Sequence, residues 1–152
     1  MQLSQRLEEV FLNGKWIANT NFKIALDDVH FEQATTLHGN HNSIAALTFH
    51  INYYLDGLLN VFKGGPLEIR DKYSFDMPSL NTEKEWTDLK NVLYNNATLF
   101  STYVKGCSDD QLHMVFVKEE YGTYRRNIER IIEHAFYHLG QILLLKKIIL
   151  TT

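Results

Sequence analysis

The chain has 152 residues, of which 45% are hydrophobic and 22% charged, and these shares are typical of a globular protein rather than a disordered or fibrous one. A length of this size favours one domain with one core, which we expect to span residues 1–152. The net charge is −3 and the basic residues are scattered, so no nucleic acid partner is expected, because phosphate binding needs a concentrated basic face.

No apolar stretch reaches the length of a membrane span, and the polar N-terminus lacks a signal segment, so we expect no membrane association and a cytoplasmic location. Cys107 is the one cysteine in the sequence, which excludes an intramolecular disulfide and a cysteine-based zinc site. Any metal site must therefore rest on histidine or carboxylate ligands.

The first part of the chain carries two apolar sets at helical spacing. The first set predicts a short amphipathic helix that Asn13-Gly14 stops or bends, and it consists of Leu3, Leu7, Val10 and Phe11. The second set lies in residues 16–29 and has three possible N-caps, namely Asn19, Thr20 and Asn21. Whether residues 2–29 form one kinked helix or two stays open, and residues 30–41 predict a loop.

The next predicted helix is central and heavily buried. It begins after the possible caps Asn42-Ser43, covers residues 44–62, and carries a regular apolar stripe of Ile44, Leu47, Ile51, Leu55, Leu58 and Phe62. Gly64-Gly65-Pro66 ends it, and a long connection without helical period follows. A long connection allows successive helices to run parallel, so we expect the second and third bundle helices to be parallel.

Two more long helices are predicted. Thr82 and Glu85 match a capping box, and the helix after them carries apolar residues at alternating steps of three and four, namely Trp86, Leu89, Leu93, Ala97, Phe100 and Val104. Residues 113–117 predict a brief extended segment in a second long connection, and residues 127–149 predict the last helix. The whole pattern predicts an all-α fold.

The last helix contains His134 and His138, which lie four residues apart. This spacing turns the second side chain only about 40° from the first, so both imidazoles share one face, as in a two-histidine metal clip. With seven histidines in 152 residues, chance supplies roughly 0.3 such pairs. The pair therefore needs a third ligand before it indicates a site.

His50, inside the apolar helix of residues 44–62, is the natural third ligand. Three imidazoles in a helical core would each need a hydrogen-bond partner and could not all be protonated without strong repulsion, and a divalent cation resolves both problems. The residues alone favour equally a core histidine bonded to a tyrosine.

The segment from Asn42 to His50, followed far downstream by His134-Ala135-Phe136-Tyr137-His138-Leu139-Gly140-Gln141, resembles the DinB-like, or YfiT-like, superfamily of metal-dependent enzymes over nearly the whole chain. The resemblance implies an up-down-down-up four-helix bundle, with long connections between helices 2 and 3 and between helices 3 and 4. It also implies homodimers and a metal-ligand triad of His50, His134 and His138.

The resemblance implies a thiol S-transferase for some members and leaves others without an assigned activity. A three-histidine site has open coordination positions, and imidazole suits nickel, zinc, iron or manganese. We therefore expect a divalent metal ion and a small-molecule substrate. A transferase would use a low-molecular-weight thiol, and a hydrolase would use an acyl compound. The alternative is a non-catalytic, metal-stabilised bundle that serves dimerisation or partner binding.

Two further residues are candidates for positioning a ligand or lining a substrate pocket: Gln141, three residues after His138, and Tyr54, one turn after His50. For Gln141, simple helix packing is the stronger alternative. No carboxylate has a spacing that compels an acid or base role, so no catalytic residue is assigned. The remaining four histidines are expected to face solvent, and Cys107 is expected to be an ordinary thiol. Residues 142–150 are apolar on more than one face, which favours a homodimer.

Overall fold

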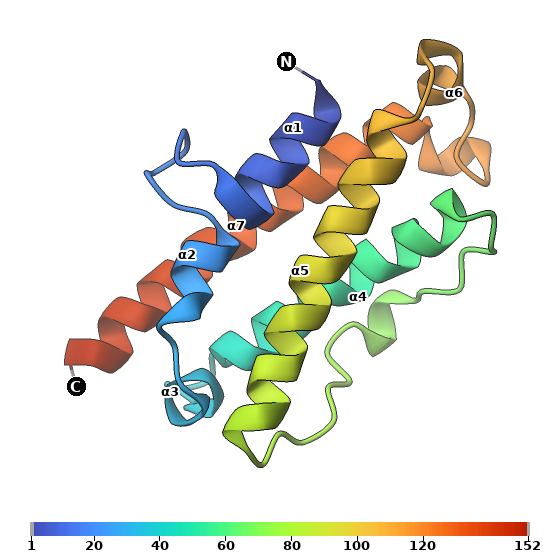
Figure 1. The fold of residues 1–152 in the computed structure, drawn as a ribbon. Helices are drawn as coiled ribbons and strands as arrows, with labels where there is room; N and C mark the ends of the chain where they lie inside the picture. The colour runs from blue at the N-terminus through green and yellow to red at the C-terminus, as the bar shows by residue number, and fades with distance from the viewer. Residues whose placement is uncertain (1, 152) are drawn as a thin grey trace.

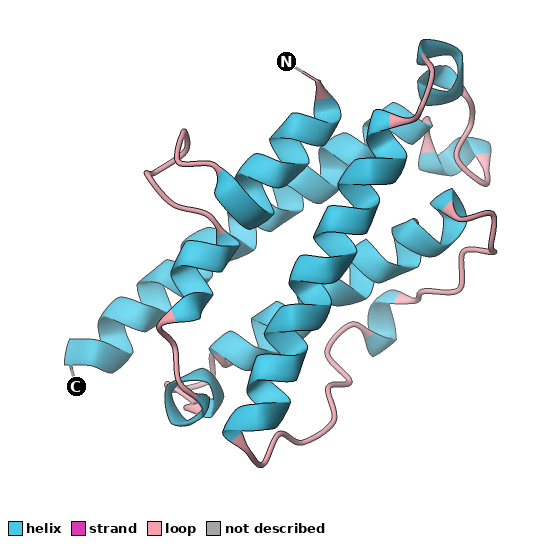
Figure 2. Ribbon diagram, in the orientation of Figure 1, coloured by secondary structure: helices cyan, strands magenta, loops and turns pink. Residues whose placement is uncertain are grey.

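A computed structural model describes residues 2–151, and this part of the chain is helical without any β-strand (Figure 2). The single trace of β-structure in it is an isolated antiparallel bridge between Val115 and Thr123. The all-α prediction is therefore confirmed. None of the helices in this part combines the length and the apolar content needed to cross a bilayer.

Four helical segments dominate the structure. They are α1 (Leu3–Glu8) with its π-helical continuation η1 (Glu9–Asn13), α4 (Ile44–Phe62), α5 (Glu83–Lys105) and α7 (Tyr124–Thr151). Figure 1 shows α4 and α5 both running toward the end of the molecule where α6 lies, whereas α1 and α7 run the other way. The connection of residues 63–82 spans the molecule between the end of α4 and the start of α5.

The starts of α4 and α5 follow the capping residues in the sequence. Ser43 Oγ accepts a hydrogen bond from the Ala46 amide (3.1 Å), and Thr82 Oγ1 accepts one from the Glu85 amide (3.1 Å). The Glu85 carboxylate accepts from the Asn81 amide (2.6 Å), one residue before the expected Thr82. The cap at Thr82 was thus predicted, and the reciprocal bond is displaced by one residue.

Residues 2–29 form separate helices rather than one kinked helix. The chain leaves η1 at Gly14 and turns through Ala18 and Asn19, which have φ angles of 53° and 56°. Helix α2 (Phe22–Asp27) then starts at Asn21, whose side-chain oxygen accepts from the Ile24 amide (2.9 Å). Of the three possible caps in the sequence, Asn21 is the one used.

The prediction of a loop over residues 30–41 was wrong in its first part, because Phe31–Thr35 form a short helix, α3. Its start is held by two side chains: Gln33 accepts from the His30 amide (3.0 Å), and Glu83 accepts from the Phe31 amide (2.6 Å). Glu83 belongs to α5, so a tertiary contact completes this helix start. Local spacing alone could not reveal it.

The connection between α5 and α7 also contains a helix, α6 (Asp109–His113), capped by Ser108 and Gln111. The extended segment expected over residues 113–117 is reduced to the single bridge at Val115. Helix α7 begins at Tyr124, three residues before the predicted start. The Thr123 hydroxyl accepts from the Arg126 amide (3.1 Å) and satisfies one donor of this helix end.

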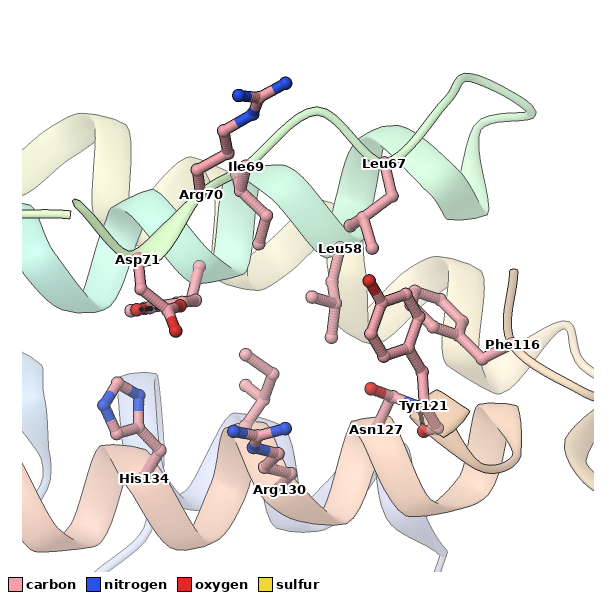
Figure 3. Close-up of a pocket in the computed structure, with 12 residues that line it drawn as sticks. Leu58, Leu67, Ile69, Arg70, Asp71, Phe116, Tyr121, Asn127, Arg130 and His134 are labelled. Atoms are coloured by element: carbon pink, nitrogen blue, oxygen red, sulfur yellow. Dashed lines mark hydrogen bonds between the residues drawn. The ribbon is translucent and has the colours of Figure 1, made fainter. Parts of the chain in front are cut away.

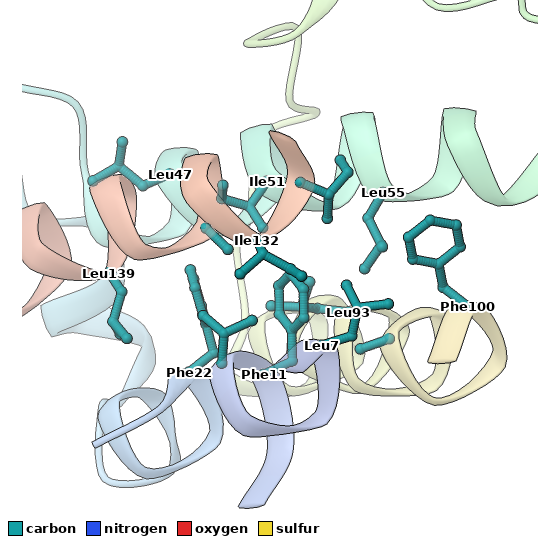
Figure 4. Close-up of a cluster of buried hydrophobic side chains, with 14 of the residues drawn as sticks. Leu7, Phe11, Phe22, Leu47, Ile51, Leu55, Leu93, Phe100, Ile132 and Leu139 are labelled. Atoms are coloured by element: carbon teal, nitrogen blue, oxygen red, sulfur yellow. The ribbon is translucent and has the colours of Figure 1, made fainter. Parts of the chain in front are cut away.

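The core lies between the long helices, and Figure 4 shows side chains from the N-terminal helices, α4, α5 and α7 meeting there. The apolar stripes predicted for α4, α5 and α7 supply most of it. The largest fully buried side chains include Trp86, Phe11, Phe22, Phe100, Phe116, Leu55, Leu93 and Ile128. The Trp86 indole N–H donates to the Val29 carbonyl (2.7 Å), so the largest core residue has its polar group satisfied.

The connection of residues 63–82 packs directly on α4. Gly57 makes this possible, because a Cβ at this position would collide with the Ile69 side chain. The Tyr53 hydroxyl donates to the Arg70 carbonyl (2.9 Å) and accepts from the Arg70 amide (2.7 Å). These contacts fix the 3₁₀ turn η2 (Asp71–Tyr73) and the residues after it over His50.

Candidate metal centre

The structure brings His50 of α4 together with His134 and His138 of α7. The Nε2 atom of His134 lies 3.3 Å from His50 Nε2 and 2.9 Å from His138 Nε2. Nitrogens bound to one metal at about 2.1 Å would be about 3.4 Å apart in a tetrahedral site and about 3.0 Å apart in an octahedral one. The two distances from His134 Nε2, to His50 and to His138, therefore lie close to those that a shared divalent ion requires, and ligand nitrogens of all three rings lie within 4.8 Å of one another.

Gln141 orients one of these rings. His138 Nδ1 lies 2.6 Å from Gln141 Oε1, which can only accept, so the proton of this ring is on Nδ1. The lone pair of His138 is then on Nε2, which faces the other two histidines. A histidine ligand whose second nitrogen donates to a carbonyl oxygen is the usual arrangement at metal sites.

Hydrogen bonds alone satisfy this cluster poorly. His138 Nε2 is an acceptor, so a proton on His134 Nε2 could be donated to it. The same proton would have to serve the longer contact with His50 Nε2 as well. His50 carries its proton on Nδ1 both in this arrangement and when Nε2 binds a metal; this nitrogen is buried and has no well-formed hydrogen bond in the described structure, so it does not distinguish the two states. A cation bound by all three Nε2 atoms uses every lone pair at once, so the residues present fit a divalent metal.

The surroundings favour neutral rings, which is the state that binds metal. Burial lowers the pKa of His134 to about 4, and the nearby His138, His50 and Arg130 act in the same direction. Burial also lowers the pKa of His50, with His138 adding to the effect, and lowers the pKa of His138 against the opposing hydrogen bond of Gln141. The three rings are thus deprotonated at neutral pH without a metal.

Residues of the connection between α4 and α5 cover His50. The Phe75 ring stacks on the His50 ring with centroids 4.0 Å apart and planes 10° from parallel. His50 is only 7% exposed, although Phe75 itself is exposed on its outer face. The Ser74 backbone favours the charged form of the same ring, and this offsets part of the lowering of the His50 pKa by burial.

Tyr54 lies beside the histidines and is tied to the same connection. Its ring contacts the rings of His50 and His134 edge-on, with centroids 5.1 and 5.2 Å apart, and its hydroxyl donates to Asp71 Oδ1 (2.8 Å). Burial and the Asp71 carboxylate raise the pKa of Tyr54, so the phenol stays protonated. Tyr54 and Asp71 form a hydrogen-bonded pair at the edge of the cluster.

A pocket of about 430 Å³ opens next to His134 (Figure 3). Its walls are apolar along α4 and the connection, where Leu58, Leu67 and Ile69 line it, and Phe116 and Tyr121 close the far end. Its polar lining includes the Tyr54–Asp71 pair and Arg130, one helical turn before His134. A molecule in this pocket could reach the histidine cluster.

The five residues that the sequence singled out therefore lie together: the three histidines form the cluster, Gln141 contacts His138, and Tyr54 lines the pocket. Sequence reasoning missed Asp71, Phe75 and Arg130. Arg130 could have been found, because it precedes His134 by four residues and so shares its helix face. Asp71 and Phe75 lie in an irregular connection, where no periodicity reports which side chains face the core.

The other candidates remain outside the cluster. The four remaining histidines, as expected, are exposed, and they are His30, His38, His41 and His113. Glu133 points into an ion pair with Arg126 (3.2 Å) rather than toward His134. Burial raises the pKa of the Cys107 thiol, which is what an ordinary unreactive cysteine requires.

Comparison of the chain with models of known protein families, with characterised proteins and with solved structures finds no match.

Proposed function

We propose that the protein is a divalent-metal-dependent enzyme of the DinB-like type, with one domain over residues 1–152. The directions of α1, α4, α5 and α7 support the proposed up-down-down-up four-helix bundle (Figure 1). The sequence order of His50, His134, His138 and Gln141 supports the family assignment, together with the position of the histidines on α4 and α7.

The observation that carries the proposal is the convergence of three histidine Nε2 atoms beside an open pocket. His50, His134 and His138 would hold the ion, and nickel, zinc, iron and manganese are all compatible with imidazole ligands. A divalent ion there supplies Lewis acidity and makes a neighbouring thiol or water easier to deprotonate. The proposed reactions are thiol S-transfer with a low-molecular-weight thiol, or hydrolysis of a small acyl compound.

The surrounding residues would prepare the site for such chemistry. Gln141 keeps the lone pair of His138 directed at the ion, and Phe75 shields His50 from solvent. Asp71 is the one carboxylate among the pocket-lining residues, and its Oδ1 atom accepts from Tyr54. We assign Asp71 as the acceptor for a proton released by the thiol or water, with Tyr54 fixing its orientation.

A screen of the metal-loaded protein tests this function. Small thiols are paired with electrophiles, and acyl esters and amides are tested alone, each with the nickel-, zinc-, iron- and manganese-loaded protein. Turnover that disappears in His134→Gln and falls in Asp71→Asn is the expected result. Turnover that is equal in both variants and in the metal-free protein would contradict the proposal.

A metal with a purely structural role is the rival explanation. Structural zinc sites are closed by four protein ligands, whereas the cluster in the described residues has three, and a pocket adjoins it. The geometry therefore favours a catalytic site. A metal ion that stabilises the fold but binds no exogenous ligand would support the structural role instead.

We also propose that the protein forms a homodimer through the C-terminal part of α7. Leu144 and Leu150 are 60% and 65% exposed there, which is a large apolar area for a free surface. A twofold dimer would bury this face of each copy against the same face of the other.

A further inference from the structure

The arginines of α7 differ in whether a carboxylate neutralises them. Arg125 pairs with Glu129 (3.8 Å) and Arg126 pairs with Glu133 (3.2 Å). Arg130 has no ion pair within the described part of the chain, although Asp71 lines the same pocket. Of the three arginines of this helix, the one without a carboxylate partner among the described residues is therefore the one nearest the histidine cluster.

Arg130 also faces the pocket. Figure 3 shows its side chain between His134 and Asn127 on the pocket side of α7, whereas the side chain of Arg70, the other arginine of the lining, leads away from the pocket. A guanidinium with two parallel N–H groups in such a place is suited to a carboxylate.

The far wall of the pocket is held rigidly. The buried Asn127 donates from Nδ2 to the carbonyls of Tyr121 (2.8 Å) and Thr123 (2.9 Å), which fixes the segment before α7 over the pocket. The space for a ligand is thus bounded by Arg130 on α7 and by Leu58 on α4. Side chains four residues apart on a helix are about 6 Å apart at Cβ, which suits a small molecule with two or three carbons between its two polar ends.

We propose that this pocket selects an anionic substrate, a small carboxylate-bearing molecule whose carboxylate pairs with Arg130 while its reacting sulfur or oxygen faces the three histidines. This inference rests on the proposed function and adds the substrate class. The apolar walls receive the carbon chain, and Arg130 sets the specificity for a negative charge.

The test uses the full-length protein loaded with Co²⁺, whose visible absorption reports a thiolate that joins the site. Two ligands of equal size are titrated, 3-mercaptopropionate and the neutral 3-mercaptopropanamide, and the ratio of their Kd values is the readout. The variant is Arg130→Gln, and the matched control is Arg126→Gln, which removes an arginine one turn earlier that is paired with Glu133.

The ratio of the two Kd values, which measures the carboxylate preference, should fall about tenfold in Arg130→Gln, because one charge-assisted pair is lost. The ratio should be unchanged in Arg126→Gln. Arg130→Lys, which keeps the charge without the planar fork, should lie between them. A preference that is unchanged in Arg130→Gln would mean that the carboxylate is recognised by the metal alone, and this would overturn the inference while leaving the metal site intact. A wild-type protein that takes up no Co²⁺ would overturn the proposed function and this inference together.

Discussion

At the scale of single residues, the site depends on which nitrogen of each histidine carries the proton. His138 has its Nδ1 proton fixed by Gln141, whereas His50 has a buried Nδ1 without a well-formed partner. An oriented ring loses less entropy when it binds a metal, and its donating hydrogen bond makes the ligand nitrogen more basic. Gln141 is therefore expected to contribute to metal affinity without touching the metal.

We predict that Gln141→Leu lowers the affinity for Zn²⁺ by about tenfold to a hundredfold. The reason is the loss of the 2.6 Å contact that holds the His138 ring. Competition with a chromophoric chelator measures the affinity. Glu133→Gln, a change at an exposed position of the same helix, is the control and should leave it unchanged; equal affinity in Gln141→Leu and wild type would show that the amide only packs.

The histidines also make the stability of the metal-free protein depend on pH. Their pKa values are lowered in the folded state, so the unfolded chain, with pKa values near 6.5, binds protons more readily as the pH falls. Stability is therefore complete above about pH 7 and is lost as the pH falls from about 6.5 toward about 4, the folded-state pKa of His134.

Urea denaturation at several pH values across this window measures the effect, for which we expect roughly 1–2 kcal/mol from His134 because its ring is partly exposed. In His134→Gln the pH dependence should be shallower by this amount. A parallel pH dependence in variant and wild type would contradict the lowered pKa.

At the scale of elements, the connection between α4 and α5 completes the site, and Gly57 allows it to lie there. Gly57→Ala would place a methyl group against Ile69 and push the connection, with Asp71 and Phe75, away from the histidines. We predict a loss of roughly 1–3 kcal/mol in the free energy of unfolding, together with weaker metal binding.

Gly140→Ala is the matched control, because it lies in α7 with no atom near the added methyl group. This change should stabilise the protein by about 0.5–1 kcal/mol, since alanine is the better helix former. Thermal unfolding of both variants gives the comparison. A Gly57→Ala protein as stable as wild type would mean that the connection can move without cost.

The elements also divide what the sequence can predict from what it cannot. The periodic apolar stripes of α4, α5 and α7 and the caps Ser43 and Thr82 follow from local rules, and the helical spacing of His134, His138 and Gln141 places them on one face. Of the two side chains that hold the start of helix α3, Gln33 is local, whereas Glu83 lies 52 residues away from Phe31. Asp71 and Phe75 reach the site through a packed irregular connection, which tertiary contacts such as that of Gly57 with Ile69 decide.

At the scale of the whole molecule, the exposed apolar residues near the C-terminus predict self-association. We expect a dimeric mass at micromolar concentration by light scattering and a monomeric mass for Leu144→Glu, which puts a charge in the proposed interface. Leu99→Glu on α5, where the leucine is 43% exposed, is the control and should stay dimeric. A monomeric wild-type protein would contradict the dimer.

The cluster joins two helices that lie far apart in the sequence, because His50 lies on α4 and its partners lie on α7. A metal bound there would stabilise the folded chain as well as serve chemistry, since the three ligands come together only in the folded protein. Metal addition should therefore raise the melting temperature of wild type more than that of any histidine variant.

The most direct test of the metal centre is an equilibrium titration of the metal-free protein with Zn²⁺, read by calorimetry, in wild type and in His50→Ala and His134→Ala. Circular dichroism confirms that each variant is folded. One ion per chain in wild type, with affinity falling by at least about a hundredfold in both variants, is the predicted result. Equal binding in all three proteins, or no binding in wild type, would contradict the three-histidine metal site.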